Sequence, residues 1–173
     1  MKLSAKGKEY TVEFTFEAAE SDVVNKAFDY FSGAYMFKGI KSNKSEDEMT
    51  DEEKLQESVA KADAMISGIS AVPRLAIDFL YMGLLENHGS HSDGDGTVTC
   101  RDDAKRIYKQ FCKENPDDIK ATQFGLFEAL KEQMEVDGFF KRIGLEQLMK
   151  TISDPEPKKT PQDHKKKITN IKA

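Results

Sequence analysis

The stretch that decides the fold is VPRLAIDFLYMGLLENHG, residues 72–89. Within residues 75–85 only Asp78 is strongly polar, so a helix formed here would be apolar on nearly every side. A helix of this kind must be surrounded by other elements, and we expect it at the centre of the domain. Pro73 is expected to begin the helix, and Gly89 is suited to end it.

Apolar residues at helical spacing predict further helices on both sides of this central segment. Upstream, Thr50 and Glu53 form a capping box that starts a separate helix before Pro73. Downstream, one helix ends at Asn115-Pro116, a second one follows, and a glycine-punctuated turn leads to a short last helix. The apolar positions of the three longer helices are Leu55, Val59, Ala62, Ile66 and Ile69; Ala104, Ile107, Tyr108, Phe111 and Cys112; and Phe127, Leu130 and Met134.

The N-terminal segment predicts a β-hairpin. Residues 2–5 (KLSA) would pair with a second strand across a turn at Lys6-Gly7. An isolated hairpin is only marginally stable in water, so we expect its apolar face to pack on helices. The second strand has one apolar face, whose residues alternate with polar ones: Tyr10, Val12, Phe14 and Phe16.

Ser21 is expected to cap a helix that runs to about Phe37. Its apolar residues form two adjacent stripes, which together are wider than a single core-facing stripe. Either this helix is packed on two sides, or part of it contacts a partner protein. The candidate partner-binding residues are one of the two stripes and a pair of aromatic residues in a turn near residue 139: Val23, Ala27, Tyr30, Ala34, Phe37, Phe139 and Phe140.

Charge divides the chain into a domain and a tail. Residues 38–54 carry six acidic residues and four lysines, which indicates a mobile acidic loop. Residues 152–173 carry six lysines, three acidic residues and three prolines, which indicates a disordered tail; docking of this tail on an acidic partner is the alternative. We therefore expect one α+β domain, mainly α-helical, over residues 1–151, in which a small hairpin packs on about five or six helices.

Composition excludes several classes of function. The 173-residue chain has a net charge of −5, whereas a general nucleic-acid or membrane-surface binder would be basic. No apolar run approaches the roughly 20 residues of a membrane span, and the N-terminus lacks a signal-peptide core, so we expect a cytoplasmic protein.

Cys100 and Cys112 would lie about 18 Å apart on one helix, too far for a disulfide. Phosphate-binding, dinucleotide-binding, nucleophile-elbow and zinc-protease motifs are missing, and we expect a protein that is not an enzyme and needs no cofactor.

Residues 91–102 (HSDGDGTVTCRD) admit two interpretations. In the first, they form a calcium-binding loop with Gly96 at the sixth position, which would make the protein a calcium-responsive helix-loop-helix binding protein. His91, however, would occupy the first position, and its nitrogen is a poor ligand for calcium. In the second, which we favour, the loop is a polar turn, and Thr99 with Asp102 caps the next helix. A transition-metal site at His88, His91 and Cys100 is less well supported. The candidate calcium ligands are Asp93, Asp95, Thr99 and Asp102.

The segments GKEYTVEFTF, VPRLAIDFLYMGLLENHG and DGFFKRIGLEQL occur in that order over residues 1–150. This part of the chain resembles the tail assembly chaperones of long-tailed phages. The resemblance implies a non-catalytic protein of the infected host's cytoplasm that is absent from the mature virion. It implies the tape measure protein as partner, with the tail tube protein as a second candidate, and a longer frameshifted form is common in the family. Coating a long partner calls for many copies, so we also expect self-association into higher oligomers or a helical array.

Overall fold

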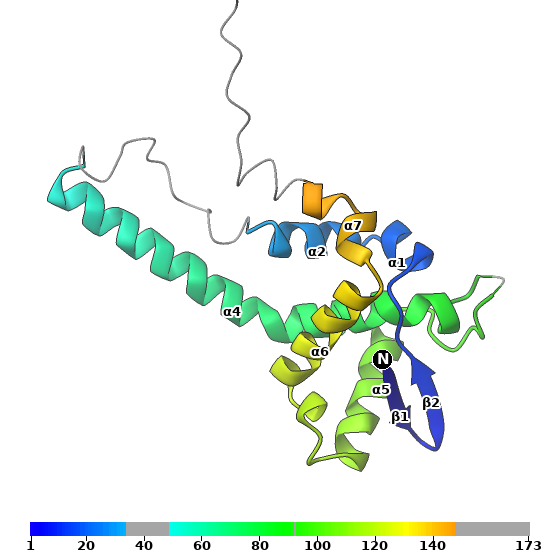
Figure 1. Ribbon diagram of the computed structural model, residues 1–173. Coiled ribbons are helices and arrows are strands. Elements are labelled where there is room, and N and C mark those ends of the chain that lie inside the picture. Colours follow the sequence, from blue (N-terminus) through cyan, green and yellow to red (C-terminus); the bar gives the residue numbers. More distant parts are fainter. Residues whose placement is uncertain (34–48, 92, 148–173) are drawn as a thin grey trace, which may run out of the picture.

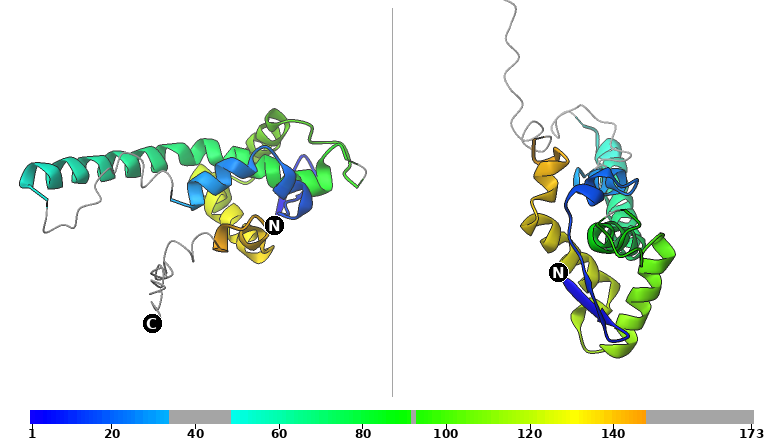
Figure 2. Two further views of the ribbon diagram at one scale, coloured as in Figure 1. Left: turned by 90° about the horizontal axis from the view of Figure 1, so that it is seen from above. Right: turned by 90° about the vertical axis from the view of Figure 1, so that its right-hand side faces the viewer.

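Helix α4 (Asp51–His88) has 38 residues and organises the domain (Figure 1). The computed structural model describes residues 1–33, 49–91 and 93–147. The second half of α4 lies among the other elements, and its first half projects away from them (Figure 1 and Figure 2). The expected central position of residues 72–89 is therefore confirmed. The expected tail and most of the expected acidic loop lie outside the described residues; residues 51–54 of that loop belong to α4.

The expectation that a new helix begins at Pro73 is wrong, because α4 runs through this residue. A proline inside a helix removes one backbone hydrogen bond and crowds the carbonyl four residues earlier, which bends a helix that is otherwise held in place. Figure 1 shows that α4 changes direction along its length. Directly after the proline, Leu75, Ala76 and Ile77 are buried, so packing holds the helix on that side. The two helices expected upstream and downstream of Pro73 are one continuous element.

The described residues form an α+β structure with six α-helices, as expected from the sequence. The buried part of α4 supplies the largest share of the core, including Phe79, Leu80, Met82 and Leu84. The elements that contact α4 are the strand β2 (Lys8–Thr11) and the helices α1 (Phe16–Glu20), α2 (Val24–Phe31), α5 (Arg101–Glu114) and α6 (Gln123–Val136). A second set packs on these neighbours: the strand β1 (Lys2–Ala5) on β2 and α5, the short helix η2 (Ile119–Ala121) on α5 and α6, and the helix α7 (Phe139–Arg142) on α6.

The N-terminal hairpin confirms the predicted pair of strands and the turn between them. Leu3 pairs with Tyr10, and the turn residues Lys6 and Gly7 have φ values of 53° and 70°. Positive φ at both central residues is what a tight two-residue turn between twisted strands requires. The buried face continues to Phe14, but Phe16 is 67% exposed because the chain turns into α1 there. The expected alternation therefore holds up to Phe14 and is wrong at Phe16.

The segment after β2 packs directly on the backbone of α4 at Gly83. The Glu13 N–H donates to the Gly83 carbonyl at 2.8 Å. A Cβ atom at residue 83 would lie 2.6 Å from Val12 Cγ1 and 2.8 Å from Phe14 Cζ. Only glycine leaves enough room for this close approach, so Gly83 fixes where the hairpin meets the central helix.

The helix expected to begin at Ser21 begins later, as α2 at Val24, and a separate short helix, α1, precedes Ser21. The expected end near Phe37 lies outside the described residues. Ser21 ends α1 in an extended conformation, and its Oγ accepts a hydrogen bond from the Val23 N–H at 3.2 Å. Helix α2 is packed on two sides, which was one of the two predicted alternatives. Its Phe31 ring lies 5.7 Å from the ring of Phe79 on α4 and 4.9 Å from the ring of Phe140 on α7.

One charged side chain, Asp78, lies in the centre of the domain with 1% of its surface exposed. Its Oδ2 accepts from Lys26 Nζ on α2 at 2.7 Å, and its Oδ1 pairs with Arg101 Nε at the start of α5. A buried carboxylate without partners would cost several kcal/mol, so these two cations are needed to keep it there. The cluster thereby ties α2, α4 and α5 together.

By length and hydropathy alone, an 18-residue window of α4 could cross a membrane. The sequence expectation that no apolar stretch approaches this length therefore needs qualification. In the folded chain 56% of that window is buried inside the domain. Packing against neighbouring elements accounts for its apolar composition.

Alanine substitutions at two glycines of α4 test this arrangement. Gly83→Ala should lower the free energy of unfolding by about 1–3 kcal/mol, because the new methyl group overlaps Val12 and Phe14. Gly68→Ala, on the same helix with nothing within 4 Å, should raise it by about 0.5–1 kcal/mol through the better helix propensity of alanine. Urea unfolding followed by circular dichroism measures both. Equal effects at the two positions would contradict the proposed contact between hairpin and helix.

Candidate functional site

The first half of α4, residues 51–70, forms an arm that lacks the packing of the second half. Among these residues only Ala64 is buried. At the rise of an α-helix the arm extends about 30 Å (Figure 1). A polar arm of this length would be unremarkable as a solvated helix, but this one is not polar on every side.

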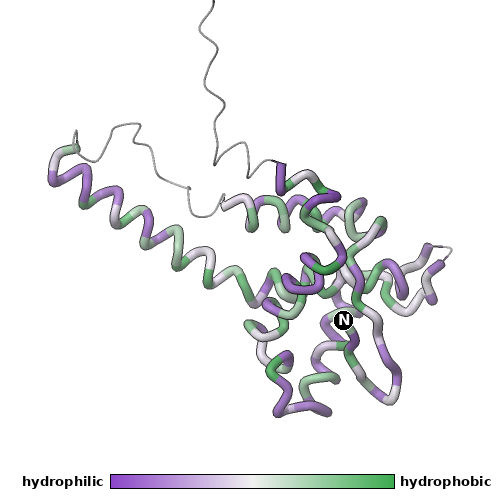
Figure 3. Tube along the Cα trace, viewed as in Figure 1, coloured by the Kyte–Doolittle hydropathy of each residue, from purple (hydrophilic) through white to green (hydrophobic). Residues whose placement is uncertain are grey.

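One face of the arm carries a row of apolar side chains, which we call the stripe. Its members follow one another at intervals of four, three, four and three residues: Leu55, Val59, Ala62, Ile66 and Ile69. The four large ones are 66%, 53%, 64% and 48% exposed, and Met65 beside them is 63% exposed. Figure 3 shows apolar and polar residues alternating along the arm.

This spacing is that of a coiled-coil seam. Apolar residues that alternate at three and four positions line up along a helix and insert between the side chains of a second helix. Five of the nine large apolar side chains that are exposed among the described residues lie on the arm. Such a concentration of exposed apolar surface marks an interaction site in a folded protein. The stripe is therefore the candidate functional site, and its geometry fits an amphipathic helix.

Local interactions stabilise the arm as a helix without tertiary packing. The Thr50 Oγ1 accepts from the Glu53 N–H at 3.2 Å, and the Glu53 carboxylate accepts from the Thr50 N–H at 2.9 Å. This is the capping box predicted from the sequence. Further along, Glu57 and Lys61 form an ion pair at 2.7 Å across one helical turn. These contacts, together with the anchored second half of α4, offset the weak tendency of an isolated helix to form.

The partner-binding residues expected from the sequence do not form an exposed surface in this structure. Val23, Ala27 and Phe139 are buried. Tyr30 and Phe140 are half-buried within the aromatic cluster between α2, α6 and α7. Ala34 and Phe37 lie outside the described residues. The wide apolar face of residues 23–31 exists because α2 packs on two sides.

The Phe139-Phe140 pair was also expected in a turn, and this is wrong because both residues belong to α7. Gly138, with a φ of 67°, ends the turn and leads into α7, which begins at Phe139. The Phe139 ring lies 5.7 Å from the ring of Phe14 in the core. Sequence reasoning assigned Leu55, Val59, Ala62, Ile66 and Ile69 to an ordinary helix; their four-three spacing was the signal that they lie in one row along it.

The loop at residues 91–102 uses its candidate calcium ligands to hold the fold together. Asp95 Oδ2 lies 2.8 Å from Lys8 Nζ and 2.8 Å from His88 Nδ1, and Asp95 Oδ1 accepts from the Thr97 N–H at 2.9 Å. His88 Nε2 accepts from the Thr11 N–H at 3.0 Å, so its ring proton is on Nδ1 and points at Asp95. The loop, the end of α4 and the hairpin are joined through this one carboxylate.

The electrostatics of Asp95 follow from these contacts. Partial burial raises the pKa of Asp95, but the hydrogen bonds from Lys8, Thr97 and His88 outweigh this effect. Together they hold the pKa well below its ordinary value of 3.8. The ionised form is therefore the one that the fold requires.

The predicted helix cap after the loop is displaced by one residue. The N-cap of α5 is Cys100, where Thr99 was expected. The side chain that accepts a hydrogen bond from the N-cap backbone is Asp103, where Asp102 was expected. Asp103 Oδ2 accepts from the Thr99 N–H and the Thr99 hydroxyl, both at 2.8 Å, and from the Cys100 N–H at 3.2 Å. Thr99 is thus engaged, while Asp93 and Asp102 are exposed. This geometry favours the structural interpretation of the loop over the calcium interpretation.

Transition-metal binding gains no support from the described part of the chain. His91 Nε2 lies 2.5 Å from the Leu85 carbonyl, and His88 is occupied by Thr11 and Asp95. Within residues 1–33, 49–91 and 93–147, no three His, Cys, Asp or Glu side chains are placed to hold a metal ion.

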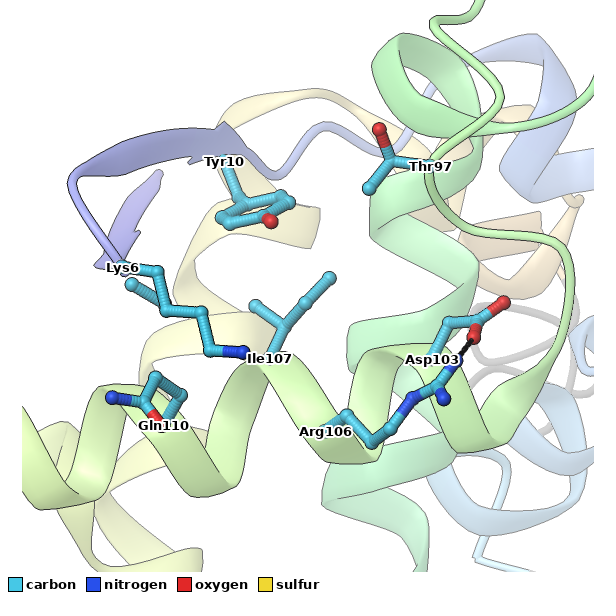
Figure 4. A pocket seen from close by; sticks show the side chains of 8 residues that line it. Lys6, Tyr10, Thr97, Asp103, Arg106, Ile107 and Gln110 are labelled. Atoms are coloured by element: carbon cyan, nitrogen blue, oxygen red, sulfur yellow. Dashed lines mark hydrogen bonds and ion pairs between the residues drawn. The ribbon is translucent and has the colours of Figure 1, made fainter.

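A hollow of about 260 Å³ lies between the hairpin and α5 (Figure 4). Tyr10 and Ile107 form its apolar part, and Lys6 and Gln110 lie at its edge. Arg106 also lines the hollow, and its guanidinium group is paired with Asp103. Because Asp103 also caps α5, the charged groups here serve the fold, and we assign no chemistry to this hollow.

Comparisons with protein-family models, curated proteins and solved structures found no match. The functional inference therefore depends on the geometry of the arm and on the sequence.

The acid sensitivity of the fold tests the role of Asp95. Because its pKa is lower in the folded chain, the unfolded chain binds more protons in acid, so the stability that Asp95 contributes is present above pH 4 and is lost as the pH falls below about 4. Asp95→Asn should lower the free energy of unfolding at pH 7. In this variant the free energy of unfolding should also fall less steeply as the pH is lowered from 4 to 2. Asp93→Asn, in the same loop but outside this network, is the matched control. Identical pH profiles for Asp95→Asn and the unmodified chain would contradict the assignment.

Proposed function

We propose that this protein is a non-catalytic assembly chaperone that holds an amphipathic helix of a client protein against the stripe of α4. The single observation that carries the proposal is the exposed row of apolar residues at four-three spacing on a projecting helix. A protein that keeps an apolar helix soluble needs a complementary apolar surface that is open to the solvent. It does not need a reactive centre.

The chemistry of the arm determines the class of client. A groove for a small molecule would be concave and would place a few polar groups at its base. The stripe is instead a ridge of aliphatic side chains that runs about 21 Å from Leu55 to Ile69. Only another elongated apolar element can cover such a ridge along its length, and the seam spacing fits a helix best.

The family resemblance adds an identity for the client. Tail assembly chaperones attend the tape measure protein, which is long, helical and apolar, and we propose a tape measure protein as the client of the stripe. Several copies would be needed along so long a client. The same resemblance supports a role in the cytoplasm of the infected host, with release of the chaperone before the virion is complete.

Co-expression with the tape measure protein from the same phage genome tests the proposal. The unmodified chain should form a complex and increase the soluble fraction of the client. The double variant Val59→Gln, Ile66→Gln should weaken binding at least tenfold, because burying one aliphatic side chain contributes about 1.5–3 kcal/mol and each 1.4 kcal/mol corresponds to tenfold in affinity. Affinity is measured with a purified client segment by calorimetry.

A matched control separates the stripe from apolar surface in general. Ile119 and Val136 are 74% and 76% exposed and lie outside the arm. The double variant Ile119→Gln, Val136→Gln removes as many apolar residues and should bind the client normally. Both double variants should keep the circular dichroism spectrum of the unmodified chain. Equal loss of binding in the two double variants would refute the proposal. A client that does not bind the unmodified chain would refute it as well.

A further inference from the structure

We propose that, in the absence of a client, the arms of two copies of this chain pair antiparallel through their stripes. This inference concerns the same surface as the proposed function but does not depend on a tape measure client. It rests on two observations. The stripe is exposed, and its spacing is complementary to that of another helix with the same spacing.

The register of such a pair follows from the side chains. When Val59 lies opposite Ile69 of the second copy, Ala62 lies opposite Ile66, so a small residue meets a larger one. Leu55 then lies opposite Pro73, and each stripe residue meets an apolar residue. The antiparallel register shifted by one heptad places Glu52 opposite Ile69 and would bury a carboxylate without a partner. The first register is therefore favoured.

Charge selects the antiparallel orientation. The arm begins with Asp51, Glu52 and Glu53. In a parallel pair the acidic turns of both copies would lie side by side and repel each other. In the antiparallel pair each acidic turn reaches the level of Ile77 of the other copy, seven residues beyond the end of that copy's arm.

The surface at that point is basic. Ile77 lines a hollow of about 440 Å³, together with Tyr108 and Cys112. Three lysines of α5 also line this hollow and follow one another at one-turn intervals: Lys105, Lys109 and Lys113. None of them forms an ion pair with a residue in the described part of the chain.

Lysines one turn apart repel each other, and an incoming acidic turn relieves that repulsion. The acidic first turn of one arm and the three lysines of α5 in the other copy are therefore complementary. Two-fold symmetry forms this contact twice. Such a pair uses the same surface on both copies and closes at two. It covers the stripe until a client helix displaces the second copy.

Cross-linking between introduced cysteines tests the pairing. Val59→Cys and Ile69→Cys are made separately in a chain in which Cys100→Ser and Cys112→Ala remove the native thiols. In the proposed register, residue 59 of one copy meets residue 69 of the other, while the two residues 59 are roughly 15 Å apart. A mixture of the two variants should form a disulfide-linked dimer under mild oxidation, and either variant alone should not.

Light scattering over a range of concentrations provides the second measurement. The unmodified chain should reach twice the monomer mass, and Ile66→Gln should shift the dimer to higher concentration by at least tenfold. A monomer at all concentrations, cross-linking of either variant alone, or a series of growing oligomers would overturn the proposal. No client is present in these experiments, so their failure is distinguishable from failure of the proposed function.

Discussion

The structure depends on the burial of the second half of α4. Residues 72–84 of this helix are apolar on nearly every side, so the hairpin, α2, α5 and α6 must enclose them. Two local features make this possible. Gly83 lets the hairpin approach the helix backbone, and Lys26 and Arg101 neutralise the buried carboxylate of Asp78. Because α4 is continuous through Pro73, enclosing its second half also fixes the direction in which its first half projects.

The two halves of α4 differ in apolar pattern, and the difference explains their roles. The second half is apolar all round, as a helix surrounded by other elements must be. The arm has a single narrow stripe with charged residues beside it, which suits contact with one helix at a time. A second copy and a client would compete for the same stripe. Under the proposed function, such competition would keep the protein soluble while it is unoccupied and would free the stripe when a client appears.

Sequence reasoning predicted the features that local chemistry determines. The Lys6-Gly7 turn, the Thr50–Glu53 capping box and the end of α5 at Asn115 are examples. It failed where tertiary packing decides, as in the continuation through Pro73, the start of α1 at Phe16 and the division between α1 and α2. The stripe residues were assigned to a helix, but periodicity cannot tell whether an apolar face is covered. For the same reason, periodicity did not show that Val23 and Ala27, expected at a partner surface, are buried.

Hydrogen exchange along α4 tests most directly whether the stripe is the surface that holds a client. In a dilute sample without client, amides of residues 51–70 should exchange rapidly and those of residues 75–85 slowly, because only the second half is enclosed. Adding a client helix should slow exchange in residues 51–70 and leave residues 75–85 unchanged. A client that binds while exchange of the arm stays rapid would be held elsewhere on the protein, and that result would contradict the role proposed for the stripe.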